Sequence, residues 1–373
     1  MTMARTSASR YLPFLGMALW LSLLFLPFGG FRAAAILFAV LAAAIPLSFL
    51  FRHGIRNAAP RIAKLGRYLP GEKIAAIGLL AAACILPLIG QDYIVDVAVI
   101  SGIYIILALG LNVVVGFTGL LNLGFVAFYA IGAYSYALLN THLGLGFWTA
   151  MPISVAIATV AGFLLAVPAV RLKGDYLALV TLGFGEIVRL ILNNWDSFTK
   201  GPNGISGIAP PYLLGMQISS LSRYYYLVLA FVLITVFVMR RVEDSKTGRA
   251  WVAIREDEIA SAAMGIRTTM YKLYSCGFAA FWAGLAGSLF AAKMRFVSPE
   301  SFTFMESVLI LCMVIIGGLG SIAGVIIGAV VLVCLPEVLR EVQLYRMLAL
   351  GAGLVFLMVF RPQGLFGGRN ASS

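Results

Sequence analysis

Charged residues that could do chemistry lie inside the apolar runs of this sequence. In the run 176–193, Glu186 and Arg189 stand three residues apart, so a helix places both side chains on one face, where they can form an ion pair. A charge inside an apolar membrane segment is costly and usually faces a partner or a pathway. Two interpretations stay open. The pair is structural, near the outer end of a helix, or it lies beside a solute path or under a docking partner.

Glycines interrupt two other apolar runs, in VGFTGLLNLGFVAFYAIGAY (115–134) and IIGGLGSIAGVIIGAVVLV (315–333). Each run passes from an apolar helix through a glycine-rich stretch into a helix of small residues. Similar breaks at corresponding points of two halves are typical of an internal repeat in a transporter, with the substrate path near the discontinuities. The candidate residues for a translocation path or helix break are Asn112, Gly116, Thr118, Gly119, Asn122, Gly317, Gly318 and Gly320.

Close helix packing is the alternative interpretation of these glycines, because small residues let helix backbones approach each other in lipid. It accounts well for four of them, Gly284, Gly287, Gly324 and Gly328. At 116–122 a break is favoured, since glycines together with Thr118 and Asn122 weaken the helix. Backbone groups freed at membrane depth are tolerated only inside protein or beside water.

The elements that must position these residues are membrane helices. Hydrophobic residues make up 61% of the 373 residues and charged residues only 11%, whereas a soluble domain carries roughly 25% charge. A membrane crossing takes roughly 20 apolar residues. The sequence predicts an all-α polytopic membrane protein with ten to twelve crossings, 306–317 being too short for a full span. The predicted crossings are 11–30, 33–51, 74–90, 97–115, 123–140, 149–170, 176–193, 224–240, 273–292, 306–317, 321–335 and 346–360.

Lys and Arg collect in the loops 52–73 and 240–272, which predicts that both loops are cytoplasmic. The segments 91–96 and 193–223 hold few basic residues and belong outside, so both termini fall inside. The first apolar run is too long for a signal peptide and is expected to stay as a helix. This topology accounts for the net charge of +12, and the sequence offers no soluble basic scaffold for nucleic acid.

Catalytic and metal sites are not expected. The cysteines lie in separate apolar runs without metal or redox spacing, and the two histidines stand apart. The sequence has no Gly-x-x-x-x-Gly-Lys-Ser/Thr loop to hold ATP phosphates, and no nucleophile and base constellation. The chain is therefore expected to bind no cofactor itself.

The segment 249–273 differs in kind from the apolar runs, because it mixes both charge signs with alanines and then reaches Gly265. Ala and Glu favour a helix, and Gly265 is expected to end it. A short cytoplasmic helix across the membrane face is predicted, with a solvated connector as the alternative. The pattern resembles the coupling helix by which ABC importer permeases bind their ATPases.

Several motifs together resemble the LivM-type permease subunit of the high-affinity branched-chain amino-acid ABC transporter. They are GLNVVVGFTGLLNLGFVAFYAIGAY, RLKGDYLALVTLGFGEIVR, GPNGIS, GRAWVAIREDEIA, FVSPESFTF and RPQGLFG, in family order from about residue 97 to 367. The resemblance implies a type II ABC importer-like permease in the bacterial inner membrane, carrying leucine, isoleucine and valine. It also implies a LivH-type permease partner, two ABC ATPases of LivG and LivF type that use ATP, and a periplasmic amino-acid-binding protein, besides membrane lipid.

The same resemblance assigns the ATPase coupling loop to Arg255, Asp257, Glu258, Ala260 and Gly265. The general Glu-Ala-Ala-x-x-x-Gly spacing puts its acid at position 259, where this chain has Ile259. Replacement of Glu258 by Lys is expected to lower uptake and binding of the partners. The domains implied are 1–73 with N-terminal helices and a basic loop, 74–367 as the permease domain, and the tail 368–373. Alternatives are an ion-coupled secondary transporter or channel and, among ABC permeases, one for urea or amides.

Overall fold

The structure, a computed structural model, describes residues 83–87, 92–170, 172, 174–213, 216–217, 220–338 and 351. The chain divides into two compact units, residues 1–83 and 84–373, and the helices and strands named below belong to the second. The predicted crossings 11–30 and 33–51, nearly all of 74–90 and 346–360, and the basic loop 52–73 lie outside the described residues.

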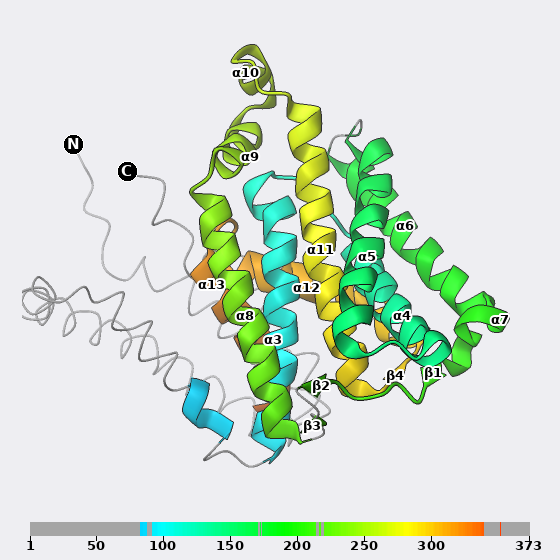
Figure 1. Ribbon diagram of the computed structural model, residues 1–373. Helices are drawn as coiled ribbons and strands as arrows, with labels where there is room; N and C mark the ends of the chain where they lie inside the picture. The colour runs from blue at the N-terminus through cyan, green and yellow to red at the C-terminus, as the bar shows by residue number, and fades with distance from the viewer. Residues whose placement is uncertain are drawn as a thin grey trace, which may run out of the picture. The chain divides into compact units, whose positions relative to one another are not determined.

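The described part of the second unit is built almost entirely of helices (Figure 1). The long ones are α3 (Asp92–Asn112), α4 (Phe125–Leu143), α5 (Phe147–Ala169), α6 (Asp175–Asn194), α8 (Leu221–Glu243), α11 (Thr268–Met294), α12 (Phe304–Gly317) and α13 (Ile322–Val338). The short ones are a π-helical turn (Val113–Phe117), α7 (Asp196–Thr199), α9 (Lys246–Glu256), α10 (Glu258–Ala263) and 3-10 turns at Gly201–Asn203 and Pro299–Phe302.

The predicted crossings between residues 97 and 335 all coincide with helices. Within the described residues, four helical stretches are long and apolar enough to cross a membrane, namely Asp92–Phe117, Phe147–Pro168, Leu221–Glu243 and Thr268–Met294. Helix α12 has only 14 residues, so the expectation that this run is too short for a full span is confirmed.

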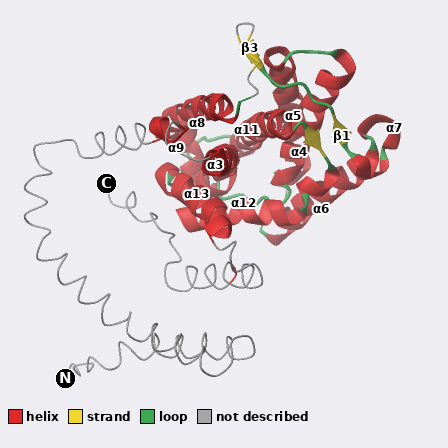
Figure 2. Ribbon diagram, turned by 90° about the horizontal axis from the view of Figure 1, so that it is seen from below, coloured by secondary structure: helices red, strands yellow, loops and turns green. Residues whose placement is uncertain are grey.

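Helices α11 and α3 form the centre of the unit. In the most apolar 18 residues of each helix, the buried share is 83% for α11 and 67% for α3, but only 39% for α5 and 33% for α8. Helix α11 packs along α4 and α5, while α3 is surrounded by α8, α11, α12 and α13 (Figure 2). The outer helices expose apolar side chains such as Leu164, Leu179 and Phe237.

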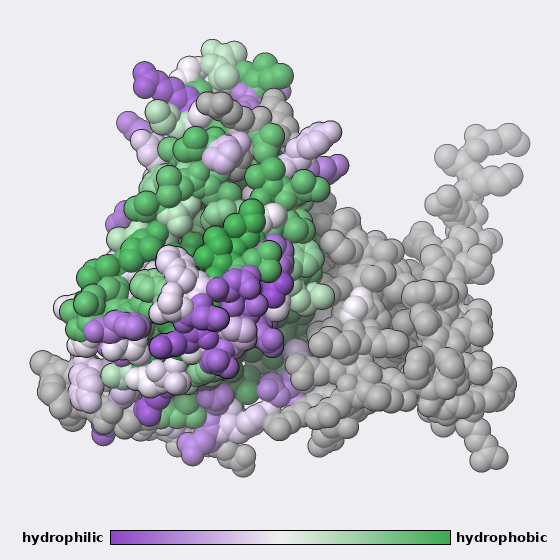
Figure 3. All heavy atoms as spheres, turned by 90° about the vertical axis from the view of Figure 1, so that its right-hand side faces the viewer, coloured by the Kyte–Doolittle hydropathy of each residue, from purple (hydrophilic) through white to green (hydrophobic). Residues whose placement is uncertain are grey.

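The face that carries α6 and α7 displays this apolar surface directly. Hydrophobic side chains cover a broad band of it, with hydrophilic ones gathered below and at the top (Figure 3). Tyr176, Leu179 and Ile187 of α6 are each more than half exposed. A helix whose outward side chains are apolar is typical of a surface that meets lipid or another membrane subunit.

Glycines set the closest helix contacts. A Cβ atom at Gly287 of α11 would overlap the backbone of α4, and one at Gly284 would lie 2.6 Å from the Cβ of Ala158 in α5. On α13, Gly324 and Gly328 stand against the backbone of α12 in the same way. The packing interpretation of these four glycines is confirmed, because no side chain fits between the backbones.

Two small antiparallel ladders lie at the end of the unit opposite α10 (Figure 1). Strand β1 (Ile205–Ser206) pairs with β4 (Phe296–Val297), with Ile205 opposite Val297. Strand β2 (Tyr212–Leu213) pairs with β3 (Met216–Gln217). The β1 and β4 ladder ties the segment 196–217 to the segment that leads into α12.

Candidate functional site

The first predicted break is present between α3 and α4. Helix α3 passes into the π-helical turn, and the chain then leaves helical geometry for residues 118–124, which we call the first break. Gly119 has a φ of 72°, in the region that favours glycine. The Thr118 hydroxyl donates a hydrogen bond to the Val113 carbonyl at 2.8 Å, and Asn122 Oδ1 accepts one from Gly124 N at 3.0 Å. Both polar side chains thus bond to backbone at the break.

The second predicted break is present between α12 and α13, in residues 318–321. Gly318 and Gly320 have φ angles of 111° and 82°, and Ser321 Oγ accepts a hydrogen bond from Gly324 N at 3.1 Å. Gly317 has a different role from its neighbours. It ends α12, and a Cβ there would lie 2.5 Å from the Gly324 carbonyl oxygen, so its small size serves helix packing.

The two breaks touch each other although they are far apart in the sequence. The Gly320 backbone N donates a hydrogen bond to Asn112 Oδ1 at 3.0 Å, and Asn112 is fully buried. A Cβ at Gly116 would collide with the Asn112 side chain and lie 2.6 Å from Gly320 N. The structure therefore brings Asn112, Gly116 and Gly320 into one cluster.

Arg255 joins this cluster from α9. Its Nη1 donates a hydrogen bond to the Gly116 carbonyl at 2.5 Å. Its Nη2 donates to Glu256 Oε1 at 3.0 Å. A residue that the sequence assigned to the coupling loop thus bonds to a residue that the sequence assigned to the first break.

The predicted single helix of the coupling loop is in fact two helices, α9 and α10. Asp257 separates them in an extended conformation, and its Oδ1 accepts hydrogen bonds from Ile259 N at 2.8 Å and Ala260 N at 3.0 Å. A side chain that caps a new helix in this way favours a restart over a continuous helix. Asp257 is therefore an N-cap in this fold.

Gly265 ends α10 as predicted. It has a φ of 88°, its N–H donates to the Ala262 carbonyl at 3.0 Å, and Ile266 N donates to the Ser261 carbonyl at 3.1 Å. This pair of bonds is the Schellman arrangement, in which a left-handed glycine closes a helix. The turn directs the chain back into α11.

Two apolar side chains, one on α10 and one at its C-cap, point outward. Ile259 is 78% exposed and Met264 is 84% exposed. Ala260 is also exposed, whereas Ser261 is buried. In Figure 1 α10 projects beyond the ends of the long helices, where another protein can reach it.

Glu258 forms an ion pair with Lys272 of α11, with Nζ and Oε1 2.6 Å apart. The Lys272 side chain is only 4% exposed. Loss of the partner of a buried charge is strongly destabilising. A change of Glu258 to Lys therefore affects the fold of this loop as well as any docking, and it does not isolate partner binding.

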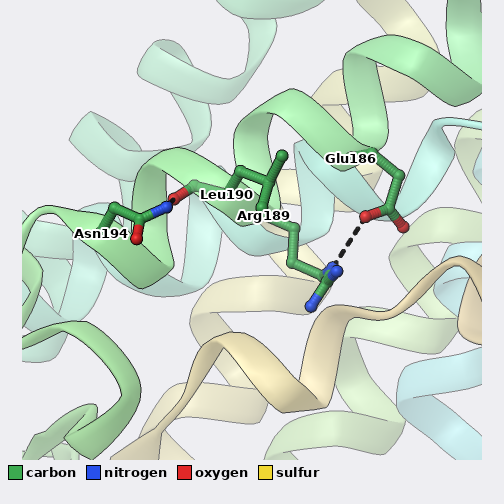
Figure 4. Close-up of polar contacts among 4 residues, drawn as sticks. All are labelled: Glu186, Arg189, Leu190 and Asn194. Carbon is green, nitrogen blue, oxygen red and sulfur yellow. Dashed lines mark hydrogen bonds and ion pairs between the residues drawn. The ribbon is translucent and has the colours of Figure 1, made fainter.

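Glu186 and Arg189 form the ion pair that their spacing predicts, with Arg189 Nε 2.9 Å from Glu186 Oε2 (Figure 4). Both side chains lie on α6 and are about one third exposed. Asn194, one turn further, donates to the Leu190 carbonyl at 2.8 Å. A role of the pair beside a solute path stays a prediction.

Long-range polar pairs inside the helix bundle escaped the sequence analysis. Tyr104 of α3 donates a hydrogen bond to Glu306 Oε2 of α12 at 2.8 Å. Lys293 of α11, 8% exposed, pairs with Asp96 of α3 at 2.9 Å. Glu306 and Lys293 could have been found in the sequence by the same signal as Glu186, because each is a charged residue within or directly beside an apolar run.

A small, mainly apolar cavity lies against the first break, with Leu120, Asn122, Leu165 and Cys276 in its wall. Thr181 of α6 also lines it and accepts a hydrogen bond from Leu123 N at 3.1 Å, which fixes α6 to the break. Among the residues that the structure describes, no group of three His, Cys, Asp or Glu side chains could hold a metal ion.

Comparison with known proteins gives a consistent set of relatives. Residues 93–360 match the family model of the permease component of branched-chain amino acid transport systems. The chain is 48% identical over 317 residues to the high-affinity branched-chain amino acid transport system permease protein LivM of Escherichia coli strain K12, covering 79% of this chain and 75% of that protein. The permease protein LivH of the same strain is 25% identical over 289 residues, covering 71% of this chain and 91% of that protein. A probable LivM of Methanocaldococcus jannaschii is 24% identical over 301 residues, covering 71% and 86%. No solved structure matches the chain.

Proposed function

The chain belongs to the family of branched-chain amino acid transport permeases, and from this we propose that it is the LivM-type permease subunit of an ATP-driven importer of leucine, isoleucine and valine. The observation that carries the proposal is the 48% identity to LivM over three quarters or more of both chains. Its relatives are transport permeases, so the chain is a transport subunit and not an enzyme.

The proposed partners are a LivH-type permease, two ATPases of LivG and LivF type and a periplasmic amino-acid-binding protein. The exposed apolar residues Ile259 of α10 and Met264 at its C-cap support ATPase docking, because an exposed apolar patch is typical of a protein contact. The sequence has no loop of its own for ATP phosphates. ATP is therefore bound and hydrolysed on the partner chains.

The proposed location is the bacterial inner membrane, with α9, α10 and both termini on the cytoplasmic side and the two strand ladders on the periplasmic side. Support comes from the basic residues around α9, including Arg240, Arg241 and Lys246. At the opposite end Lys293 is paired with Asp96, which offsets its charge.

Cysteine labelling tests this orientation. In a variant without the native cysteines, Ala263→Cys is expected to resist an impermeant thiol reagent in intact cells and to react after the membrane is opened, whereas Ser206→Cys reacts in intact cells. Both positions are exposed. Ser261, two residues earlier, is only 5% exposed and would resist the reagent on either side. Labelling of position 263 in intact cells would reverse the orientation.

Reconstitution tests the function itself. Proteoliposomes that contain the chain with its permease, ATPase and binding-protein partners are expected to accumulate labelled leucine only when ATP is supplied. Excess isoleucine or valine should compete with leucine, and excess urea should not. Leucine movement by the chain alone down an ion gradient, without nucleotide, would replace the proposal by a secondary transporter. Competition by urea would place the chain among the urea permeases.

A further inference from the structure

Arg255 stands where the docking helices meet the two breaks. It lies in the last turn of α9, and its guanidinium donates to the Gly116 carbonyl at 2.5 Å. A Cβ at Gly119 would lie 2.7 Å from Arg255 Cγ, and one at Gly320 would lie 3.4 Å from Arg255 Nη1. One side chain from α9 is therefore in close range of glycines from both breaks.

The Gly116 carbonyl suits this contact because the helix ends beside it. Thr118 N bonds to the Val113 carbonyl and Leu120 N to the Val114 carbonyl, so the helical series of bonds does not continue past the π-helical turn. A carbonyl in an apolar bundle needs a donor. Arg255 supplies a charged one, which makes a stronger hydrogen bond than a neutral donor.

The two breaks are connected to each other as well as to Arg255. Asn112, one residue before the π-helical turn, accepts a hydrogen bond from Gly320 N. Gly116 and Gly320 are packed so closely that not even a Cβ atom fits between them. The two breaks are therefore in direct contact through one hydrogen bond and closely packed backbone.

Helix α9, which carries Arg255, is fixed to α11 and capped at its start. Trp251, one turn earlier on α9, is buried, and its Nε1 donates to the Tyr271 carbonyl of α11 at 2.8 Å. Ser245 caps the start of α9 by accepting a hydrogen bond from Gly248 N at 3.1 Å. Arg255 therefore extends from a helix that is fixed to α11 four residues earlier.

We propose that Arg255 is a positioning residue that transmits displacement of the α9 and α10 helices to the paired glycine breaks, a task separate from ATPase docking. The proposal rests on the proposed function as an ATP-driven importer. ATP-driven movement of the docked partner shifts α9, Arg255 pulls or releases the Gly116 carbonyl, and the two breaks change together. Without this contact the partner hydrolyses ATP but the breaks do not follow.

The test measures ATP hydrolysis and leucine uptake in the same proteoliposomes, with the complete transport system. Arg255→Met removes the donor while keeping a long side chain. It is expected to lower the leucine moved per ATP hydrolysed by about fivefold, about 1 kcal/mol of coupling. Partner binding is measured in the same samples, and the ratio is compared only between assembled complexes. Arg255→Lys keeps a charged donor on a long side chain and is expected to retain most of the coupling.

Arg241→Met is the matched control, because the Arg241 guanidinium lies over the Phe237 ring on α8 and not at the breaks. It is expected to leave the leucine to ATP ratio unchanged. If Arg255→Met fails to assemble, Arg255→Gln, whose side chain is uncharged and shorter than arginine, takes its place with the same expected loss.

A wild-type ratio in the assembled Arg255→Met or Arg255→Gln variant would overturn the inference, as would an equal loss in Arg241→Met. Arg255→Lys with a ratio as low as Arg255→Met would contradict the role of the hydrogen bond. Failure of the proposed function looks different, since the wild-type system itself would then show no uptake that depends on ATP.

Discussion

Gly119→Val is expected to lower leucine uptake at least about tenfold at equal membrane abundance. Gly119 has a φ of 72°, where a β-branched residue is strained by about 1–3 kcal/mol. A side chain there also meets Arg255, whose Cγ lies 2.7 Å from the position of a Cβ. A penalty near 1.4 kcal/mol in the working conformations corresponds to about tenfold in rate. Labelled leucine uptake, normalised to the amount of protein in the membrane, measures the effect.

The control for this change must be a glycine whose surroundings accept a side chain. Gly183 of α6 meets nothing within 4 Å of an added Cβ and has no positive φ, so Gly183→Val is expected to keep uptake within about twofold. Gly284, which the packing interpretation suggests as a comparison, is a poor control. It stands against Ala158 and Val155 of α5, and a methyl group there would itself disturb the bundle.

A second substitution separates backbone strain from lost space at the first break. Asn tolerates the left-handed region far better than Val, so Gly119→Asn keeps the backbone angle while it still pushes against Arg255. If uptake by Gly119→Asn falls between that of wild type and that of Gly119→Val, part of the loss comes from backbone strain and part from the contact with Arg255. Normal uptake by Gly119→Val would show that the first break is only a connection between helices, with no part in transport.

The helices and the two breaks could be predicted from the sequence because both follow from local composition. Long apolar runs predict helices, and each described run formed one. Glycines with positive φ at 119, 318 and 320 interrupt them where predicted. The stop at Gly265 followed from the same reasoning, since a left-handed residue after a short helix has an ordinary sequence signal.

Contacts between distant segments could not be predicted in this way. The Asn112 to Gly320 bond joins residues 208 positions apart, and the Arg255 to Gly116 bond joins residues 139 apart. No residue spacing in the sequence indicates either bond, because each depends on how separate helices pack against each other. Asp257 is different: Asp is a favoured N-cap residue, and this signal could have predicted that a new helix begins at Glu258.

The double change Ile259→Gln and Met264→Gln is expected to lower copurification of the ATPase partners at least about tenfold, with a matching loss of leucine uptake. Ile259 of α10 is 78% exposed and Met264 at its C-cap is 84% exposed, so the fold of the chain does not depend on their burial. Burying an apolar side chain of this size in an interface is worth about 1.5–3 kcal/mol. Loss of about 1.4 kcal/mol already weakens binding about tenfold.

The position of Ile259 makes this test specific. The family spacing puts an acid at 259, where this chain has an apolar side chain instead. The neighbouring acid, Glu258, forms an ion pair with Lys272 inside the chain. Apolar contact, rather than charge, is therefore expected to hold the partner at this point, and binding should depend weakly on salt. Leu143→Gln is the matched control, since Leu143 is 67% exposed at the end of α4. Unchanged copurification in the double variant, or an equal loss in Leu143→Gln, would mean that the ATPases bind elsewhere on this chain.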